Sequence, residues 1–143
     1  IVDAITDDHL IAIGEAVAPL PRFEMEVKGL GAFPTAGRAR VLWIGVVGES
    51  RDRLVELQRV VSQTAAKVGH PPTDDRFHPH VTLGRARAGR GPVPNVVGIC
   101  QHYGDVLAGP LPVEAVVTVA SELTPKGPIY RTLSSSPLSG GSP

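Results

Sequence analysis

A seven-residue apolar run, residues 41–47, constrains the fold of this chain most strongly. It reads Val-Leu-Trp-Ile-Gly-Val-Val, and no charged residue interrupts it. The run is far shorter than the ~20 residues that cross a bilayer, and its β-branched content favours a buried strand. Residues 23–30 come earlier in the chain and largely alternate apolar with charged side chains, which is typical of a strand with one wet face. We therefore expect residues 41–47 to form a central strand that pairs antiparallel with residues 23–30.

The remaining segments predict helices and further strands. Apolar residues recur at helical spacing in residues 8–18 and again in residues 50–69, where Gly69 is a natural end. The segments with strand composition are residues 80–83, 111–120 and 130–133. Residues 95–107 leave a short helix and irregular structure both open. The pattern predicts an α+β domain over residues 1–135, with helices packed on antiparallel or mixed sheets. Residues 136–143 end a Ser/Gly/Pro-rich stretch, and we assign them to a flexible tail.

Bulk composition limits the partners that the chain can have. Fourteen Lys and Arg residues balance fourteen Asp and Glu residues, so no global positive field exists to hold a long nucleic acid non-specifically. The one cysteine, Cys100, cannot form an internal disulfide, which favours a reducing compartment. No apolar run is long enough to span a bilayer. We expect a cytoplasmic monomer without membrane contact.

A candidate phosphate-handling site lies in the His80-Val81-Thr82-Leu83 segment. Side chains alternate along a strand, so His80 and Thr82 share one face, and Val81 and Leu83 are expected to face a core. An imidazole can move a proton near neutral pH, and a hydroxyl can donate a hydrogen bond to a phosphoryl oxygen. The arginines that flank this segment are Arg76, Arg85, Arg87 and Arg90. A lone His-x-Thr triplet is common by chance, so the surrounding residues decide its weight.

Those surroundings resemble a known family. Residues 76–85, Arg-Phe-His-Pro-His-Val-Thr-Leu-Gly-Arg, resemble the second signature of the two-histidine (2H) phosphoesterases. The similarity is to the branch of RNA 2′,3′-cyclic phosphodiesterases, historically called 2′-5′ RNA ligases. Further matching segments are residues 29–34, 40–46 and 121–123 together with Tyr130. The likeness covers residues 5–135 and implies a bilobal 2H phosphoesterase-like fold.

The resemblance also implies a reaction and a substrate. Such enzymes hydrolyse 2′,3′-cyclic phosphate ends to 2′-phosphomonoesters and can join RNA ends through reversible 2′-5′ ligation. His80 would be the base that activates water, and Thr82 would hold a non-bridging phosphate oxygen. The implied partners are RNA ends or nucleoside 2′,3′-cyclic phosphates, with tRNA halves among them. Two histidines, one neutral and one charged, can carry both proton transfers, so no cofactor or metal is expected.

One departure from the family pattern stands out. The family carries two His-x-Thr/Ser motifs, and this sequence contains only the one at His80, because the residues after His9, His70 and His102 do not fit. We expect that the N-terminal strands with the first motif are missing and that the 143-residue chain is inactive or severely impaired. An alternative is a non-catalytic module that binds RNA ends or nucleotides.

Four residues around the motif are candidate substrate ligands: Arg76, Phe77, Arg85 and Tyr130. Strict alternation turns Arg85 away from His80, unless the strand bulges at Gly84. For Phe77 we favour a core anchor over a platform on which a base stacks. Tyr130 could stack on a base or pack on a sheet.

A metal site is the competing interpretation of the same segment. His78 and His80 form a His-x-His pair, a spacing that zinc sites use. The third ligand would come from His70, His102 or Asp75. Thr82 would have no role in such a site, and for that reason we expect no metal.

Overall fold

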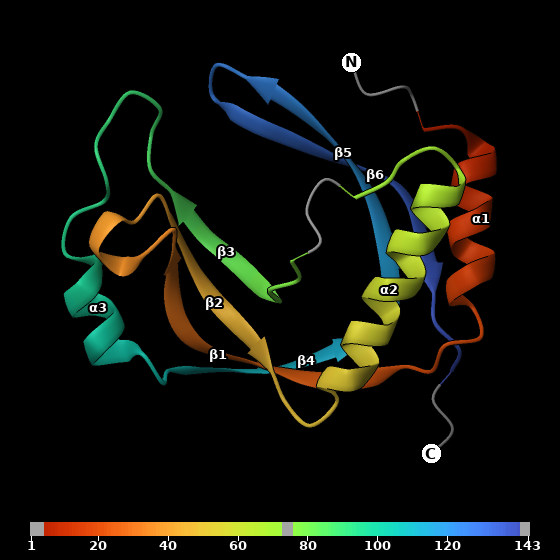
Figure 1. The fold of residues 1–143 in the computed structure, drawn as a ribbon, viewed down its shortest axis with the longest axis horizontal. Helices are drawn as coiled ribbons and strands as arrows, with labels where there is room; N and C mark the ends of the chain where they lie inside the picture. Colours follow the sequence, from red (N-terminus) through yellow and green to blue (C-terminus); the bar gives the residue numbers. More distant parts are fainter. Residues whose placement is uncertain (1–4, 73–75, 141–143) are drawn as a thin grey trace. The chain divides into compact units, whose positions relative to one another are not determined.

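The computed structural model describes residues 5–72 and 76–140 (Figure 1). Its elements in chain order are α1 (Asp7–Val17), β1 (Phe23–Phe33), the 3-10 turn η1 (Ala36–Arg38), β2 (Val41–Val47), α2 (Arg51–Lys67), β3 (His80–Arg85), α3 (Val96–Tyr103), β4 (Leu107–Val113), β5 (Ala115–Thr124) and β6 (Gly127–Pro137). Helices and antiparallel strands are mixed along the chain, which confirms the predicted α+β class. No helix in these ranges is long and apolar enough to cross a membrane.

Residue contacts divide the chain into two compact units. We call residues 1–23, 52–77 and 113–143 the first unit, and residues 24–51 and 78–112 the second unit. Each unit is assembled from segments that are distant in the sequence. Each is therefore described separately below.

The first unit packs the helices α1 and α2 with the hairpin β5–β6 around an apolar cluster. The cluster centres on Val17, Leu57 and Leu138, which are at most 7% exposed. Helix α1 begins after Thr6 and ends at Val17, just before the prolines at positions 19 and 21, which cannot continue a helix. Partly buried residues complete the cluster: Leu20, Phe23, Val60, Val61, Val113 and Val116.

The C-terminal residues of the first unit correct one prediction. Residues 136–143 were expected to form a flexible tail, yet β6 runs to Pro137 and Ser136 is only 4% exposed. Leu138 is 3% exposed, and its backbone N–H donates to the carbonyl of Glu114 at 2.8 Å. The tail assignment is therefore wrong for residues 136–138, because a Ser-rich composition does not reveal long-range strand pairing.

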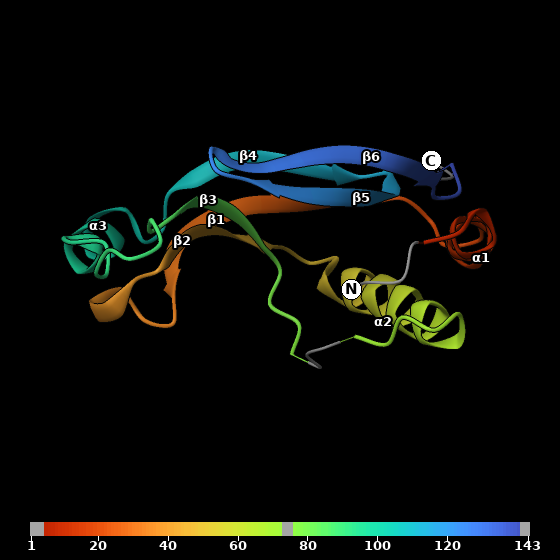
Figure 2. The same ribbon diagram turned by 90° about the horizontal axis from the view of Figure 1, so that it is seen from above.

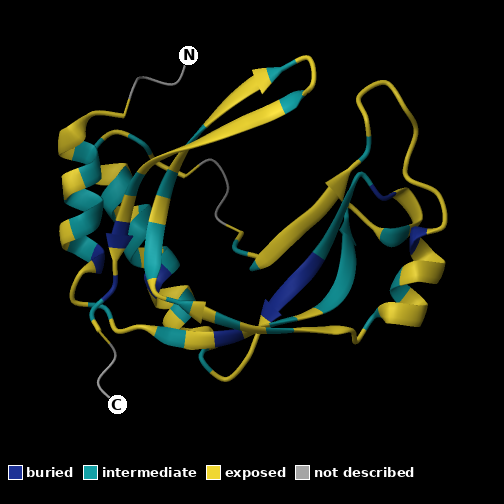
Figure 3. Cartoon of the chain, turned by 180° about the vertical axis from the view of Figure 1, so that it is seen from behind, coloured by how far each residue is buried: buried dark blue, intermediate teal, exposed yellow. Residues whose placement is uncertain are grey.

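The second unit is built on a four-stranded sheet in the order β3-β2-β1-β4. Strands β1, β2 and β3 lie side by side in both ribbon views (Figures 1 and 2). β2 lies between β1 and β3 and pairs antiparallel with each of them, so its predicted central position is confirmed. Ile44 and Val46 on β2 are 6% and 7% exposed, and Met25 on β1 is 1% exposed. Residues 44–46 of the apolar run are therefore buried in this sheet and drawn in dark blue in Figure 3, whereas residues 41–43 are half-buried.

Two further expectations change in the structure. Residues 111–120 do not form one strand, because β4 ends at Val113 and β5 starts at Ala115. Val81 and Leu83 were expected to face a core but are 42% and 54% exposed. Both lie on β3, an edge strand of the sheet that is exposed along its whole length (Figure 3). An edge strand has a neighbour on one side only, so alternation alone does not bury its apolar residues.

Candidate functional site

The pairing of β3 with β2 places the His-x-Thr motif. His80 lies opposite Gly45, and Thr82 lies opposite Trp43. Directly opposed residues of an antiparallel pair present their side chains on the same face of the sheet. His80, Thr82 and Trp43 therefore share one face of the second unit, as the alternation in the sequence predicted for the two motif residues.

A bulge in β3 adds Arg85 to this face. The register shifts between Leu42 and Trp43, so Gly84 pairs with Leu42 while Thr82 pairs with Trp43, and Leu83 is the extra residue. Arg85 then pairs with Val41, two positions from Trp43 on β2. The expectation from strict alternation, that Arg85 turns away from His80, is wrong. The strand does bulge, as the alternative expectation required, but the extra residue is Leu83 and not Gly84.

Aromatic rings surround His80 on the same face. The ring centroids of Phe33 and His80 are 5.1 Å apart, nearly perpendicular at 85°. Trp43 lies 5.3 Å from Phe33 and 4.7 Å from His78, measured between ring centroids. Gly31 makes room for Trp43, since a Cβ atom at position 31 would overlap the indole and would lie 2.7 Å from its Cε2 atom. Phe33, Trp43 and Gly31 were not predicted from the sequence to have a role in the site. The sequence signal that could have found them is the expected pairing of residues 23–30 with residues 41–47. Continued along both segments, this pairing places their alternate residues on the face of His80.

One hydrogen bond fixes which nitrogen of His80 is available. The Nδ1 atom lies 2.6 Å from the backbone carbonyl oxygen of His78. A carbonyl oxygen can only accept, so Nδ1 must carry the hydrogen and donate it. The lone pair of the neutral imidazole is then on Nε2. Such a contact to a backbone carbonyl commonly sets the tautomer and orientation of functional histidines. His80 is exposed, so Nε2 can take a proton from a water molecule or a substrate hydroxyl.

The predicted substrate ligands fall in both units. Arg85 lies in the second unit, on the face of His80 and Thr82. Arg76 and Phe77 belong to the first unit, where Phe77 is half-buried. Tyr130 is also in the first unit, on β6, and is 65% exposed, so it is not buried by sheet packing. The structure thus groups His80, Thr82 and Arg85, and the roles of the other three stay predictions.

The metal alternative lacks a third ligand in the part of the chain that the structure describes. Across residues 5–72 and 76–140, no three His, Cys, Asp or Glu side chains are grouped so that they could hold an ion. The ring of His70 contacts that of His9 at 4.8 Å, and the ring of His102 contacts Tyr103 at 4.5 Å. Asp75 lies outside the described residues.

Comparison with known proteins places these features in a family. A family model described as the 2′-5′ RNA ligase superfamily matches residues 1–126. A protein of Aeropyrum pernix named RNA 2′,3′-cyclic phosphodiesterase is 40% identical over 137 residues, which are 92% of this chain and 75% of the relative. A protein of the same name from Archaeoglobus fulgidus is 37% identical, over 78% of this chain and 60% of its own length. The chain also spans 56% of its Methanothermobacter thermautotrophicus relative. Two of these three relatives are thus matched over less than two thirds of their length.

Solved structures show the same fold. A protein of Thermus thermophilus superposes with a TM-score of 0.63 at 32% identity, covering 95% of this chain and 73% of that one. The structure of Escherichia coli LigT without ligand gives a TM-score of 0.61 at 21% identity, covering 94% of this chain and 70% of LigT. LigT has also been solved in complex with 3′-AMP. These likenesses agree with the expected 2H phosphoesterase-like fold.

Proposed function

The chain belongs to the 2′-5′ RNA ligase superfamily, and from this we propose that it provides the general base of an RNA 2′,3′-cyclic phosphodiesterase. The substrate class is an RNA end or a nucleoside that carries a 2′,3′-cyclic phosphate. The product is the 2′-phosphomonoester. The names of the relatives from Aeropyrum pernix and Archaeoglobus fulgidus support this reaction.

The observation that carries the proposal is the hydrogen bond from His80 Nδ1 to the carbonyl of His78. It leaves the Nε2 lone pair free to take a proton from water, and the resulting hydroxide attacks the phosphorus. The bond between phosphorus and the ribose 3′-oxygen then breaks, and that oxygen takes a proton from an acid. Thr82, on the same face as His80, donates a hydrogen bond to a non-bridging oxygen and stabilises the charge that develops there.

The same base also suits a ligation reaction. When the 5′-hydroxyl of a second RNA replaces water, the attack forms a 2′-5′ linkage. The proposal includes tRNA halves as substrates, and it describes a cytoplasmic protein that works as a monomer. The 3′-AMP complex of LigT, a protein with this fold, is consistent with a nucleotide-sized ligand.

Turnover of a nucleoside 2′,3′-cyclic phosphate tests the proposal. General acid and general base each contribute ~10²–10⁴-fold, and the sequence has a single His-x-Thr motif. We therefore expect low turnover by the 143-residue chain and robust turnover by a form that includes an upstream first motif. In that form, His80→Ala should lower kcat by ~10²–10⁴-fold without changing the circular dichroism spectrum.

The matched control is His102→Ala, because His102 is an exposed histidine on α3 that contacts only the ring of Tyr103 among the described aromatic residues. It should leave turnover unchanged. Near-normal turnover by the His80→Ala protein would remove His80 from the mechanism.

The second candidate function is a non-catalytic module that binds RNA ends or nucleotides, and the single His-x-Thr motif in the sequence is what favours it. Absence of turnover from every form, combined with retained binding of a 2′-phosphorylated nucleotide, would select it over the enzyme.

A further inference from the structure

Charge is separated between the two units, although the chain as a whole is neutral. The second unit contains seven Lys or Arg residues and four Asp or Glu residues, a net charge of +3. The first unit contains seven and ten, a net charge of −3. The overall neutrality, which argued only against a global field that holds a long nucleic acid non-specifically, therefore conceals a basic unit, and that unit carries His80.

Five of the seven cations of the second unit lie in two segments that meet in the fold. They are Arg38, Arg40, Arg85, Arg87 and Arg90. We call them the arginine cluster. Within the described residues the one ion pair joins Arg59 to Glu56 in the first unit, so no member of the cluster is neutralised by a described carboxylate. Four of the five are exposed, and Arg40 is half-buried.

Two backbone hydrogen bonds and one from a side chain hold the two segments of the cluster together. The N–H of Ala86 donates to the carbonyl of Arg40 at 2.8 Å, and the N–H of Val93 donates to the carbonyl of Ala39 at 2.9 Å. The Nη1 atom of Arg40 donates to the carbonyl of Arg90 at 2.6 Å. The loop that follows β3 is thus fixed at both ends on the segment before β2, and its arginines are held close to one another.

The end of β3 and this loop line a solvent-open hollow whose arginines suit it to bind a phosphate group. The hollow has a volume of about 350 Å³ and is lined by Arg85, Arg87 and Arg90 together with residues 86 and 91–94. The lining residues include no acidic and no aromatic side chain. Guanidinium groups bind phosphate oxygens in a bidentate manner. With no ring on which a base could stack, the hollow suits the phosphodiester backbone and not a particular base.

The hollow lies at the end of β3, the strand that carries the His-x-Thr motif. Arg85 and His80 pair with Val41 and Gly45, which are four residue steps apart on β2. At ~3.3 Å per step, their backbones are about 13 Å apart along the strand. A single nucleotide bound at His80 does not cover that span, whereas a chain that extends for a few more nucleotides does.

We infer that the arginine cluster binds the phosphodiester backbone of the RNA on the 5′ side of the cyclic phosphate. The inference rests on the proposed function, which places the 3′-terminal cyclic phosphate at His80. The cluster then makes the protein favour RNA ends over mononucleotides, without sequence preference. This recognition is electrostatic, so it weakens as salt concentration rises.

Binding of a labelled single-stranded oligoribonucleotide of about 12 nucleotides tests the inference in the 143-residue chain. The variant is R87Q/R90Q, which removes two exposed guanidinium groups of the loop. We expect Kd to rise roughly tenfold. We also expect the slope of log K against log salt to become shallower by about 1.4, because each contact to a single strand contributes about 0.7.

The matched control is R53Q/K67Q, which removes two exposed cations from α2 in the first unit. It should leave both Kd and the salt slope unchanged. An unchanged Kd in the R87Q/R90Q protein, or an equal loss in the control, would overturn the inference.

A second arm separates this inference from the proposed function. Turnover of a nucleoside 2′,3′-cyclic phosphate, measured in a form with an upstream first motif, should be the same with and without R87Q/R90Q, while kcat/KM for the oligonucleotide falls. If the protein turns over the nucleoside and R87Q/R90Q leaves kcat/KM for the oligonucleotide unchanged, the proposed function stands and the inference about the arginine cluster is wrong. Weaker oligonucleotide binding by R87Q/R90Q, combined with no turnover of any substrate by any form, rejects the enzyme and keeps the cluster as an RNA-binding surface.

Discussion

The two compact units use their side chains differently. The first unit buries Val17, Leu57 and Leu138 in one cluster and has a net negative charge. The second unit buries residues 44–46 of β2 but leaves all of β3, with His80 and Thr82, exposed, and it has a net positive charge. The difference indicates that the apolar cluster of the first unit and the proposed phosphate site of the second unit lie in separate parts of the chain. A change in one unit should therefore leave the properties of the other largely intact.

The largest expected effect is the loss of core packing in the first unit. Leu138→Ala removes a side chain that is 3% exposed and should lower the free energy of unfolding by about 2–5 kcal/mol. The measurement is urea denaturation. The control, Leu123→Ala, changes a leucine that is 87% exposed, and it should shift stability by less than about 0.5 kcal/mol. Equal stabilities of the two variants would mean that the C-terminal residues do not belong to the core.

A smaller effect is expected from crowding the rings around His80. In Gly31→Ala the new methyl group meets the indole of Trp43, so the ring must shift, at a cost of about 1–3 kcal/mol. Because Trp43 contacts Phe33 and His78, turnover should fall together with stability.

Gly37→Ala is the matched control for this change, since nothing lies within 4 Å of the Cβ position there. The readouts are Trp43 fluorescence, the unfolding midpoint and turnover. If Gly31→Ala preserved the emission spectrum of Trp43, the glycine would not be needed to seat the indole.

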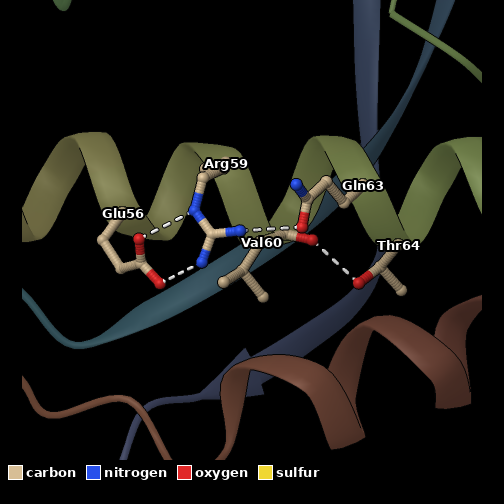
Figure 4. Close-up of polar contacts among 5 residues, drawn as sticks. All are labelled: Glu56, Arg59, Val60, Gln63 and Thr64. Atoms are coloured by element: carbon tan, nitrogen blue, oxygen red, sulfur yellow. Dashed lines mark hydrogen bonds and ion pairs between the residues drawn. The ribbon is translucent and has the colours of Figure 1, made fainter.

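The smallest expected effect concerns the surface of α2. Arg59 donates from Nε to Oε2 of Glu56 at 2.8 Å and pairs with Oε1 as well (Figure 4). This hydrogen bond from Arg59 lowers the pKa of Glu56. A lowered carboxyl pKa stabilises the fold above the pKa of an unfolded glutamate, and the contribution is lost as pH falls through the folded value.

The difference in melting temperature between the protein and Glu56→Gln should therefore be small at neutral pH and vanish in acid. It should also shrink in high salt, because both groups are exposed. A double-mutant cycle with Arg59→Gln measures the coupling directly. A difference that grows in acid would contradict the assigned sign.

Local patterns predicted the elements whose signals are local. Residues 41–47 were expected to be a central strand, and β2 has those bounds and lies between two neighbours. The helix predicted at residues 8–18 is α1, and the resemblance to the RNA 2′,3′-cyclic phosphodiesterase branch is confirmed by the family model and the relatives. The face shared by His80 and Thr82 followed from alternation alone.

Long-range pairing explains what local patterns missed. The bulge at Leu83 depends on the register with β2, so the side of the sheet that Arg85 faces could not be read from residues 80–85. Leu138 is buried because its backbone pairs with Glu114, which is remote in sequence. The short helix α3, left open in the sequence, has few turns and one buried residue, Val96, so its periodicity is weak. The arginine cluster likewise depends on the hydrogen bonds that bring residues 38–40 to the loop after β3.

The tautomer of His80 tests the central claim most directly. Long-range ¹H–¹⁵N correlation spectra of protein labelled at the histidine nitrogens distinguish a protonated from an unprotonated ring nitrogen, and His80→Ala assigns the signals. With the imidazole neutral, the hydrogen bond to the His78 carbonyl predicts a protonated Nδ1 and an unprotonated Nε2. A neutral His80 that carries its hydrogen on Nε2 would have no free lone pair where the mechanism needs one, and it would contradict the account.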